Sequence, residues 1–260
     1  MDYGINLNSV IPLRAKPDDR SEMVSQLLMG ERFICEETQN GFYKISNAID
    51  NYSGWVDEKT ITSITQDEYM NLADQTTYYV VIPLAEAFDL TSKCVIRIPG
   101  GSRLPNCDSI GRFGMHDRKF QVHRDFILSE SEISRDGVLL TAVGFINSPY
   151  MWGGKTVMGI DCSGFTQIIF GLHGIKLPRD SKDQSMLGEA VNFGDIKPGD
   201  LVFFENKDGN VVHVGIYFEK QGIIHASGRV KIDSLDEQGI YSNEYQRYTH
   251  KLHSIRRVIK

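Results

Sequence analysis

Asp161-Cys162-Ser163-Gly164 is the stretch from which the rest of the sequence is best interpreted. It follows a loop rich in small residues (152–160) and leads into the apolar stretch 165–170, whose spacing predicts a helix. A helix that begins at a cysteine places the sulfur at the positive end of the helix dipole, which favours the reactive thiolate. Because a lone cysteine at a helix start is more often a small packed hydrophobe, other parts of the chain must decide between packing and chemistry.

The composition excludes several classes of protein. The chain has 260 residues, which is enough for one large domain or a few small ones. Its net charge is −6 and it has no basic stripe or Lys/Arg block, so we expect neither nucleic acid nor a membrane surface as partner. No apolar run approaches the roughly 20 residues that cross a bilayer. Residues 1–5 lack the basic and apolar regions of a signal peptide, so we expect a cytoplasmic protein, or an exported one if the chain is a processed form.

The cysteines and histidines indicate no metal site. Cys35, Cys94, Cys107 and Cys162 are scattered without a C-x-x-C pair, which argues against a zinc ribbon. A bridge between Cys94 and Cys107 stays open, although reduced, packed thiols are the better interpretation. The histidines outside the candidate site show no metal-ligand spacing and are interpreted as surface or packing residues. They are His116, His123, His173, His250 and His253. We expect no metal and no cofactor.

The first half of the chain predicts short strands between turns. Residues 1–64 contain several short apolar pieces at close spacing, with a hairpin signal at Gln39-Asn40-Gly41, which is typical of a small barrel. Thr65 is followed three residues later by Glu68, which predicts a capping box and a short helix, interpreted as a linker over 65–76. A second strand-rich block follows over 77–130. It ends at the acidic run Glu130-Ser131-Glu132, which predicts a solvated helix start.

From residue 131 the sequence pattern changes from short strands to helices followed by strands. Residues 138–146, and the stretch from Cys162 to Gly171 or Gly174, have helical spacing. Later stretches predict strands separated by turns, and they are 201–204, 211–218, 223–227 and 252–259. Helices first and an antiparallel sheet afterwards indicate an α+β domain over 131–260.

The predicted strand 211–218 carries the first candidate partner of the cysteine. Its even positions form an unbroken apolar face, which we assign to the core. They are Val212, Val214, Ile216 and Phe218. His213 lies on the opposite face beside Gly215, which leaves room next to the imidazole. His225 lies on the next predicted strand across a tight turn, so the two imidazoles are neighbours if the register allows it, and the sequence does not fix the register.

Cys162, His213 and His225 form the set that nucleophilic catalysis by a thiol requires. A thiol with an ordinary pKa near ~8.5 is mostly protonated at neutral pH, so an imidazole must accept its proton and later protonate the leaving amine. We assign Cys162 as the nucleophile and His213 as base and acid. His225 then orients His213 and holds its tautomer, although a neutral histidine stabilises an imidazolium less than a carboxylate does.

Five motifs occur in linked order along the second half of the chain. They are Tyr150-x-Trp152-Gly153-Gly154, Asp161-Cys162-Ser163-Gly164-Phe165, Lys197-Pro198-Gly199-Asp200-Leu201, His213-Val214-Gly215-Ile216-Tyr217 and Ile224-His225-Ala226. Together they resemble the NlpC-type papain-like cysteine peptidases of bacteria, which cut cell-wall peptides, over residues 132–260. The resemblance implies Cys162, His213 and His225 as the catalytic residues. It also implies that Tyr150 supports the oxyanion together with the Cys162 amide.

The N-terminal part resembles the bacterial SH3-like domains that are often attached to this family. The combination is similar to the γ-D-glutamyl-L-diamino-acid endopeptidases of cell-wall recycling, which cut between D-Glu and the diamino acid of a peptide with free N-terminal L-Ala. The resemblance implies acidic and aromatic side chains around the free amine, because an ammonium needs a carboxylate or an aromatic face.

The candidate substrate-binding residues are Tyr52, Asp161, Ser163, Asp180, Ser181, Trp152 and Glu22. Three of them have structural alternatives that stay open. Asp180 is also a candidate helix N-cap, and Tyr52 a candidate surface residue of the barrel. Trp152 is the most suited to shaping the loop or a wall of the site.

The sequence therefore predicts a multi-domain protein with two N-terminal small all-β SH3-like barrels (1–64 and 77–130), a helical linker (65–76) and a C-terminal α+β papain-like peptidase domain (131–260). We expect a monomer that hydrolyses the murein peptide L-Ala-γ-D-Glu-diamino acid. Two rival hypotheses use the same residues. One is a catalytically inert wall-peptide-binding or scaffold protein, and the other is an amidase or acyltransferase with the same Cys-His-His set. The sequence does not indicate which diamino acid is preferred.

Overall fold

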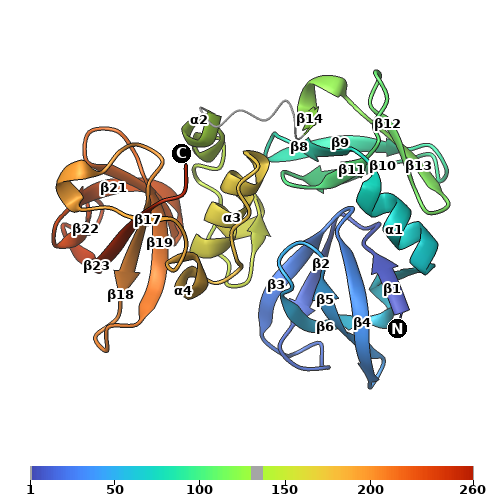
Figure 1. Cartoon of the computed structure of the whole chain (residues 1–260), viewed down its shortest axis with the longest axis horizontal. Coiled ribbons are helices and arrows are strands. Elements are labelled where there is room, and N and C mark those ends of the chain that lie inside the picture. Colours follow the sequence, from blue (N-terminus) through green and yellow to red (C-terminus); the bar gives the residue numbers. More distant parts are fainter. Residues whose placement is uncertain (1, 130–136, 260) are drawn as a thin grey trace. The chain divides into compact units, whose positions relative to one another are not determined.

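The structure is a computed structural model that describes residues 2–129 and 137–259 (Figure 1). The chain divides into two compact units: unit 1 contains residues 1–133 and 152–157, and unit 2 contains residues 134–151 and 158–260. The predicted domain boundary at 130/131 and the acidic run Glu130-Ser131-Glu132 lie outside the described residues. None of the helices in the described part of the chain is long and apolar enough to span a membrane.

Unit 1 begins with a seven-stranded sheet in the order β3-β2-β6-β5-β4-β1-β7. Its strands are β1 (Asp2–Ile5), β2 (Val10–Arg14), β3 (Met23–Leu28), β4 (Arg32–Gln39), β5 (Phe42–Asn47), β6 (Ser53–Asp57) and β7 (Thr62–Ile64). Burial alternates along β2, because successive side chains of a strand point to opposite faces. Ile11 and Leu13 point inward and join Leu27 and Phe33 in one apolar cluster. The short apolar segments of residues 1–64 therefore contribute their side chains to this cluster.

The predicted hairpin at Gln39-Asn40-Gly41 is confirmed. β4 ends at Gln39, β5 begins at Phe42, and these two residues pair. Asn40 has a φ of 54° and Gly41 a φ of 76°, so both turn residues occupy the left-handed region that a two-residue type I′ turn requires. Asparagine and glycine tolerate this conformation, which is why local sequence was sufficient to predict it.

The second block of unit 1 contains a four-stranded sheet, β10-β9-β13-β12, and a three-stranded sheet, β11-β8-β14. Its strands are β8 (Thr77–Val80), β9 (Leu84–Asp89), β10 (Cys94–Pro99), β11 (Arg103–Pro105), β12 (Arg112–Met115), β13 (Arg118–Val122) and β14 (Ile127–Ser129). Its apolar cluster also takes in Ile5, Leu7, Met29 and Ile64 from the first block. The two blocks therefore share one core, which explains why they form a single unit. That the second block is another SH3-like barrel stays a prediction.

Helix α1 (Gln66–Asp74) connects the two blocks, within the segment 65–76. Thr65 is its N-cap and accepts a hydrogen bond from the Glu68 amide at 3.2 Å. The Glu68 carboxylate instead contacts Nδ1 of His116 at 3.1 Å. Only half of the predicted capping box is formed, because a residue distant in the sequence engages the Glu68 side chain. Unit 1 also contains β15 (Lys155–Thr156) and the 3₁₀ helices η1 (Glu58–Thr60) and η2 (Arg124–Phe126).

Residues 152–157 belong to unit 1, although they lie in the loop that precedes the candidate nucleophile. The Lys155 ammonium is buried and lies 3.0 Å from Oε1 of Glu31. Oε2 of Glu31 accepts a hydrogen bond from Asn47 at 2.9 Å, and the Lys155 amide donates to Gln26 at 2.7 Å. We call these four residues the fastening network, because they hold β15 against the first sheet.

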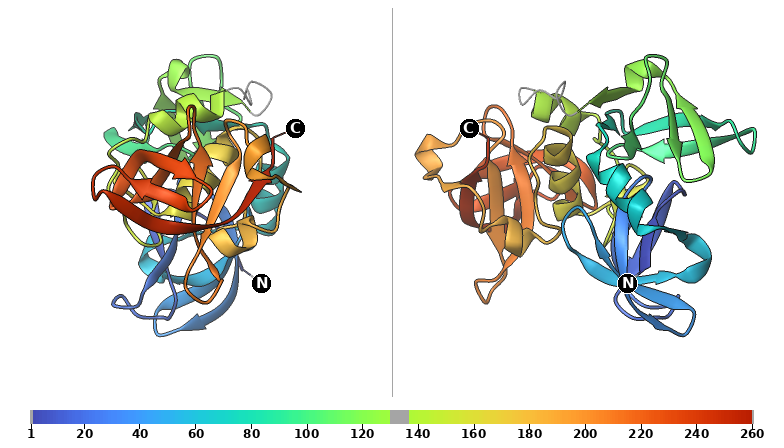
Figure 2. Two further views of the ribbon diagram at one scale, coloured as in Figure 1. Left: turned by 90° about the vertical axis from the view of Figure 1, so that its left-hand side faces the viewer. Right: turned by 45° about the vertical axis from the view of Figure 1, so that its right-hand side comes forward.

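Unit 2 places helices before a seven-stranded sheet in the order β17-β23-β18-β19-β20-β21-β22. β22 also pairs with β23, so the six strands from β23 to β22 close into a ring (Figure 2). The elements of unit 2 are α2 (Val138–Val143), β16 (Gly159–Ile160), α3 (Cys162–Leu172), α4 (Ser181–Gln184), β17 (Glu189–Ala190), η5 (Phe193–Asp195), β18 (Leu201–Glu205), β19 (Val211–Tyr217), β20 (Gly222–Ser227), β21 (Arg229–Asp236), β22 (Gly239–Ser242) and β23 (Arg247–Arg257). The arrangement agrees with the predicted α+β order.

Apolar side chains from five strands fill the inside of the ring. They are Val202, Phe204, Ile223, Leu235, Ile240 and Ile255. The register places the two candidate histidines on the same face, since Val202 pairs with Gly215, Gly215 pairs with His225, and His213 is two residues from Gly215. Helix α3 packs against β19 and β20 (Figure 1). The site residues on the strands therefore belong to the interior face of the ring.

Three expectations about the strands need correction. β21 and β22 were not predicted, and β23 begins at Arg247 rather than at Leu252. Val212, assigned to the core face, is 49% exposed, whereas His213 is buried. The reason is that β19 is covered on both faces from His213 to Ile216, so apolar alternation does not identify a single buried face.

Candidate active site

A buried ion pair holds the start of helix α3. Asp161 is the N-cap, and its carboxylate accepts a hydrogen bond from the Gly164 amide at 2.7 Å. The same carboxylate accepts two bonds from the Arg179 guanidinium, at 3.0 and 2.5 Å, and Ser163 Oγ accepts another at 2.9 Å. All three side chains are buried, and removing one partner of such a pair costs about 3–5 kcal/mol. The helix start explains why Asp161 and Ser163 occur in the motif, and the predicted contact of these two residues with substrate stays a prediction.

Cys162 is the first residue of α3 and is 7% exposed. The Val214 amide on β19 hydrogen-bonds its sulfur, so the helix start meets the strand that carries His213. The pKa of the Cys162 thiol is raised to about 12, first by burial and then by the charge of Asp161, against the lowering effect of two backbone hydrogen bonds. The backbone hydrogen bond from Ser163 at the helix start lowers this pKa, which is the predicted direction, but its effect is smaller than that of burial. Burial outweighs the helix, and the resting sulfur is a thiol.

His213 on β19 and His225 on β20 form a buried imidazole pair. Nε2 of His213 lies 2.9 Å from Nδ1 of His225. A Cβ at Gly215 would lie only 3.0 Å from the His225 Cβ, so the glycine leaves the space through which His225 reaches His213. Burial, followed by the charges of His250 and His225, holds the pKa of His213 well below its ordinary value. The resting imidazole of His213 is therefore neutral.

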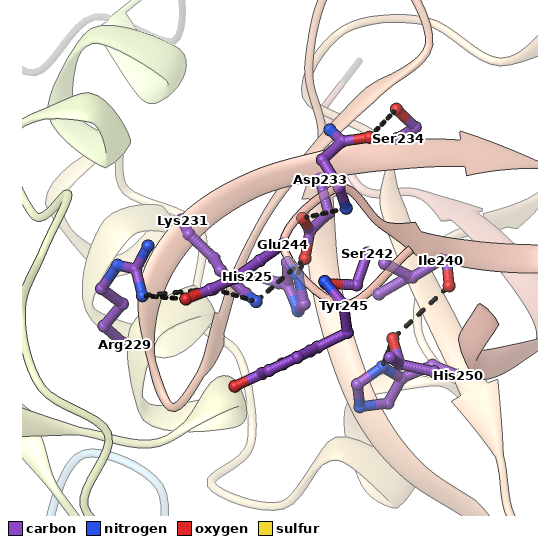
Figure 3. Close-up of polar contacts among 12 residues, drawn as sticks. His225, Arg229, Lys231, Asp233, Ser234, Ile240, Ser242, Glu244, Tyr245 and His250 are labelled. Atoms are coloured by element: carbon purple, nitrogen blue, oxygen red, sulfur yellow. Dashed lines mark hydrogen bonds and ion pairs between the residues drawn. The ribbon is translucent and has the colours of Figure 1, made fainter. Parts of the chain in front are cut away.

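A carboxylate lies behind His225. Nε2 of His225 lies 3.2 Å from Oδ2 of Asp233, a buried residue on β21. The Lys231 ammonium lies 3.2 Å from the same oxygen, and Oδ1 accepts a hydrogen bond from the Asn243 amide at 3.2 Å. Burial raises the pKa of Asp233, but the hydrogen bonds from His225 and Lys231 outweigh burial and lower it. Figure 3 shows Lys231 between the carboxylates of Asp233 and Glu244.

Of the two interpretations of His250 on β23, surface or packing residue, the structure supports packing. Its ring stacks on the His213 ring, with 4.2 Å between centroids and 24° between planes. Its pKa is lowered to about 4, first by burial and then by the charge of His225. It is a packing residue, but inside the ring and against a candidate catalytic group. Pairing of β18 with both β23 and β19 brings it there, which local sequence does not reveal.

Tyr150 lies on the segment that precedes the nucleophile loop, where its amide donates to the Gly228 carbonyl at 3.0 Å. Its pKa is raised to about 12, first by burial and then by the charges of Cys162 and Asp161. The effect of Cys162 indicates that the phenol lies near the sulfur, and a phenol with this pKa is a hydrogen-bond donor at neutral pH. This is the kind of group that the predicted oxyanion role requires, and the role itself stays a prediction.

The other predicted substrate-binding residues are distributed over both units. In unit 1, Tyr52 packs against the apolar cluster of the first block, and Nε1 of Trp152 donates to Glu22 at 2.6 Å. In unit 2, Asp180 occupies the N-cap position of α4 without a side-chain cap hydrogen bond, and Ser181 is the first residue of that helix. Asp180 is exposed. The contacts of these residues with substrate stay predictions.

The remaining cysteines are free thiols, in agreement with the favoured interpretation, but the expectation that Cys94 is packed is wrong. Cys94 is exposed, and Cys35 and Cys107 are buried. Burial raises the pKa of Cys107 to about 12 and that of Cys35 to about 11. These two thiols are therefore packed and protonated, and neither has an imidazole partner among the hydrogen bonds of the described residues.

The sequence analysis did not identify Asp233 and Lys231, nor the buried ion pair that Arg179 forms with Asp161. Lys231 pairs directly with His225 in the register, and Asp233 lies two residues further on the same face of β21. One signal was available: two opposite charges at positions i and i+2 share one face of a strand. It is weak, because on an exposed strand the same pair is a solvated surface feature.

These groups together are equipped for nucleophilic catalysis by a thiol. A neutral thiol at a helix start meets the strand of a neutral imidazole, and a second imidazole orients the first. A carboxylate lies behind the second imidazole, and a phenol lies near the sulfur. Proton transfer from thiol to imidazole generates the attacking thiolate when a carbonyl is bound, so a permanently charged sulfur is not needed.

Two protein families match the sequence. The NlpC/P60 family matches residues 147–249, and the bacterial dipeptidyl-peptidase Sh3 domain matches residues 13–61. The first match contains Cys162, His213, His225 and Asp233. The second match lies in the first strand-rich block of unit 1.

Two relatives align with most of the chain. A γ-D-glutamyl-L-lysine dipeptidyl-peptidase of Bacillus cereus is 28% identical over 249 residues, covering 86% of this chain and 74% of the relative. Dipeptidyl-peptidase 6 of Lysinibacillus sphaericus is 28% identical over 251 residues, covering 87% and 89% respectively. The crystal structure of an NlpC/P60 family protein from Bacillus cereus has a TM-score of 0.86 and 23% identity, and covers 99% of this chain and 100% of that one. At this identity the structural likeness shows the fold alone.

Proposed function

We propose, from the premise that this chain carries an NlpC/P60 domain together with a bacterial SH3 domain, that it is a cysteine peptidase of murein peptides. The proposed bond joins the γ-carboxyl of D-Glu to the diamino acid in peptides that begin with free L-Ala. The observation that carries the proposal is the buried line His213–His225–Asp233 on the strands beside Cys162. The names of the two dipeptidyl-peptidase relatives, each aligned with more than four fifths of the chain, support the substrate class.

Acylation begins from a neutral pair. Nε2 of His213 is engaged by His225, so Nδ1 is the nitrogen that accepts the Cys162 proton. The sulfur then attacks the γ-carbonyl carbon of D-Glu, and the carbonyl oxygen becomes an oxyanion. The Cys162 amide at the helix start and the Tyr150 hydroxyl are the proposed donors to this oxyanion. When the C–N bond breaks, His213 returns its proton to the leaving amine of the diamino acid, and L-Ala-D-Glu remains as a thioester on the sulfur.

Deacylation uses the same groups in reverse. His213 accepts a proton from water, the hydroxide oxygen attacks the thioester carbon, and the C–S bond breaks. The sulfur leaves as a thiolate and recovers its proton from His213, which restores the neutral pair. Asp180 is the proposed counter-ion of the free L-Ala ammonium in unit 2, because it is an exposed carboxylate at the start of α4.

The experiment compares purified full-length protein with Cys162→Ala on L-Ala-γ-D-Glu-L-Lys and on the meso-diaminopimelate peptide. Cys94→Ala, at an exposed free thiol, is the matched control. We expect hydrolysis by the wild type and by Cys94→Ala and none by Cys162→Ala, all three with the same circular dichroism spectrum. Comparable rates for Cys162→Ala and wild type would exclude thiol catalysis.

The amine requirement has its own test. N-acetylated L-Ala-γ-D-Glu-L-Lys lacks the ammonium, so we expect a kcat/KM at least about tenfold lower than for the free peptide, the size of one lost charge contact of about 1.4 kcal/mol. Asp180→Asn should reduce the rate on the free peptide and leave the acetylated one unchanged. Equal rates of the wild type on both peptides would remove the amine site from the proposal.

A further inference from the structure

We infer that Asp233, with Lys231 as its counter-ion, is a positioning group that fixes the tautomers of His225 and His213, so that Nδ1 of His213 is free to accept the thiol proton. We call these four residues the relay. The catalytic meaning of the inference rests on the proposed function. The proton positions that it assigns belong to the folded protein without substrate and are measurable separately.

The first step is that Asp233 is a carboxylate that only accepts hydrogen bonds. Three donors surround it, each at 3.2 Å: Nε2 of His225, the Lys231 ammonium and the backbone amide of Asn243. Figure 3 labels Asp233, His225 and Lys231. A cation and hydrogen bonds to the charged form favour ionisation even for a buried carboxyl group. An ionised carboxylate has no hydrogen to give, so Nε2 of His225 must carry one.

The second step follows from the neutrality of His225. Burial lowers its pKa, and the opposing effects of Asp233 and Lys231 leave it lowered. A neutral imidazole with its hydrogen on Nε2 has its lone pair on Nδ1. That lone pair lies 2.9 Å from Nε2 of His213, which must therefore donate. A neutral His213 with its hydrogen on Nε2 has its own lone pair on Nδ1.

The opposite arrangement disables the base. Without an acceptor at position 233, His225 is free to carry its hydrogen on Nδ1 and to donate to Nε2 of His213. His213 would then hold its hydrogen on Nδ1 and have no lone pair for the thiol. The geometry of the two rings is the same in both cases, so only the carboxylate distinguishes the productive tautomer from the unproductive one.

Lys231 limits how far the Asp233 carboxylate raises the pKa of His225. An unbalanced Asp233 would raise the pKa of His225 and favour its imidazolium, whose Nδ1–H donates in the unproductive direction. The Lys231 ammonium opposes this effect, and it is shared with Glu244 at 3.3 Å. Glu244 also lies 3.3 Å from Arg229, so the charges outside the relay are themselves paired.

His250 also faces the relay, since it stacks on His213, and its own pKa is lowered to about 4. It is neutral at neutral pH and adds no charge there. During acylation His213 becomes an imidazolium, which donates to His225, whose other nitrogen donates to Asp233. The Asp233 carboxylate, which lies behind His225, therefore supplies the negative charge that stabilises the His213 imidazolium and that a neutral histidine cannot supply.

The test uses the full chain and two variants of the relay. Asp233→Leu/Lys231→Met removes the acceptor without leaving a buried unpaired lysine. Asp233→Asn keeps one acceptor oxygen and is the conservative variant. Asp236→Asn, the same chemical change on the same strand at a residue that contacts Tyr248 outside the relay, is the matched control.

Long-range nitrogen–proton correlation spectra at pH 7.5 report the tautomers without substrate. We expect hydrogen on Nε2 of both His213 and His225 in the wild type and in Asp236→Asn, and hydrogen on Nδ1 of His213 in a large fraction of the double variant. A wild type with hydrogen on Nδ1 of His213 overturns the inference, whether or not the peptide is cleaved. An inactive wild type with the expected tautomers overturns the proposed function and not the inference.

Kinetics on the peptide provide the second readout. For the double variant we expect kcat to fall about 10- to 100-fold, the size of effect seen when an orienting partner behind a histidine is lost, with KM within about twofold of wild type. Asp233→Asn should lose less, and Asp236→Asn nothing. Should the double variant not fold, the two asparagine variants decide: a lower kcat for Asp233→Asn alone supports the inference, and equal kcat values overturn it.

Discussion

Among the residues that the structure describes, each unit contains one buried Lys–carboxylate pair, and the two pairs differ in their neighbours. In unit 1, Lys155 lies 3.0 Å from Glu31, the Asn47 side-chain amide donates to the Glu31 carboxylate, and the Gln26 side-chain amide accepts from the Lys155 backbone. In unit 2, Lys231 lies 3.2 Å from Asp233, and the next group is an imidazole. An amide stays uncharged and keeps its hydrogens at every pH of interest. An imidazole, in contrast, can bind a further proton and has two neutral tautomers.

The difference indicates how the same pair serves two purposes. Surrounded by amides, the pair has one protonation state and one hydrogen-bond arrangement, so it only fastens a segment. Next to a line of imidazoles, the pair selects one of two tautomers and sets where a proton can be accepted. The fastening network should therefore affect stability without affecting the pH dependence of activity, and the relay should affect activity more than stability.

The largest expected effect comes from the base at the end of the relay. His213→Gln keeps much of the side-chain volume but has no basic nitrogen, so we expect kcat/KM to fall by at least about 10⁴-fold, as when a catalytic base is removed. Peptide hydrolysis measures the effect, and circular dichroism verifies folding. Activity within tenfold of wild type would mean that His213 does not accept the thiol proton.

The second effect concerns the fastening network. Glu31→Gln leaves the Lys155 charge buried and unpaired, which should lower the free energy of unfolding of unit 1 by about 3–5 kcal/mol. Chemical unfolding, monitored by hydrogen exchange of the amides in β2–β5, measures this loss of stability. Glu31→Gln/Lys155→Met removes both charges and should recover most of the loss. The pH profile of activity of the folded variant should match that of wild type, and a shifted profile would contradict the distinction between the two pairs.

The third effect is a loss of stability in acid that is confined to unit 2. The pKa values of His213, His225 and His250 are all lowered in the folded protein, that of His250 to about 4. The unfolded chain therefore binds more protons below pH ~6.5, where its histidines titrate, and stability falls as the pH falls from there toward the folded pKa values. The slope is at most about 1.4 kcal/mol per pH unit for each histidine.

Hydrogen exchange in α3, β19 and β20 at pH 7.5, 6.5 and 5.5 measures this slope. His250→Phe keeps a stacked ring without a titratable nitrogen, so it should reduce the slope in unit 2. The strands of the first sheet in unit 1 serve as the internal reference. Equal slopes in both units, or no change in His250→Phe, would show that the imidazole cluster is not the source of acid sensitivity.

The smallest effect belongs to an exposed ion pair that serves as a baseline. Arg97 and Glu86 lie 3.2 Å apart on β10 and β9, with side chains 69% and 63% exposed. Glu86→Gln should change the free energy of unfolding by less than about 1 kcal/mol, because exposed pairs gain little from their charges. A loss as large as that of Glu31→Gln would mean that burial is not what separates strong from weak pairs in this protein.

Features determined by local sequence were predictable. The turn at Asn40-Gly41 needs two residues that tolerate positive φ, and the start of α3 needs an N-cap such as Asp161. His213 and His225 were recognisable because each lies within a short strand motif, His213-Val214-Gly215-Ile216-Tyr217 and Ile224-His225-Ala226. In each of these cases the physical cause lies within a few residues of the feature.

Features determined by distant parts of the chain were not predictable. β21 turns Lys231 and Asp233 inward and leaves Ile232 40% exposed, the reverse of the usual pattern, because His225 lies opposite. His250 reaches His213 because β18 pairs with both β23 and β19, which are distant from each other in the sequence. The raised pKa of Cys162 comes from burial, which a helix-dipole argument from sequence does not contain.

The most direct test of the account is to find the acyl group on its sulfur. Wild-type protein is mixed with L-Ala-γ-D-Glu-L-Lys, quenched in acid within the first turnovers, digested and analysed by mass spectrometry. The account predicts that the peptide containing Cys162 gains the mass of L-Ala-D-Glu less one water, and that Asp233→Leu/Lys231→Met gains it more slowly. Release of L-Lys with no adduct on Cys162 at any quench time, together with unimpaired release by Cys162→Ala, would contradict it.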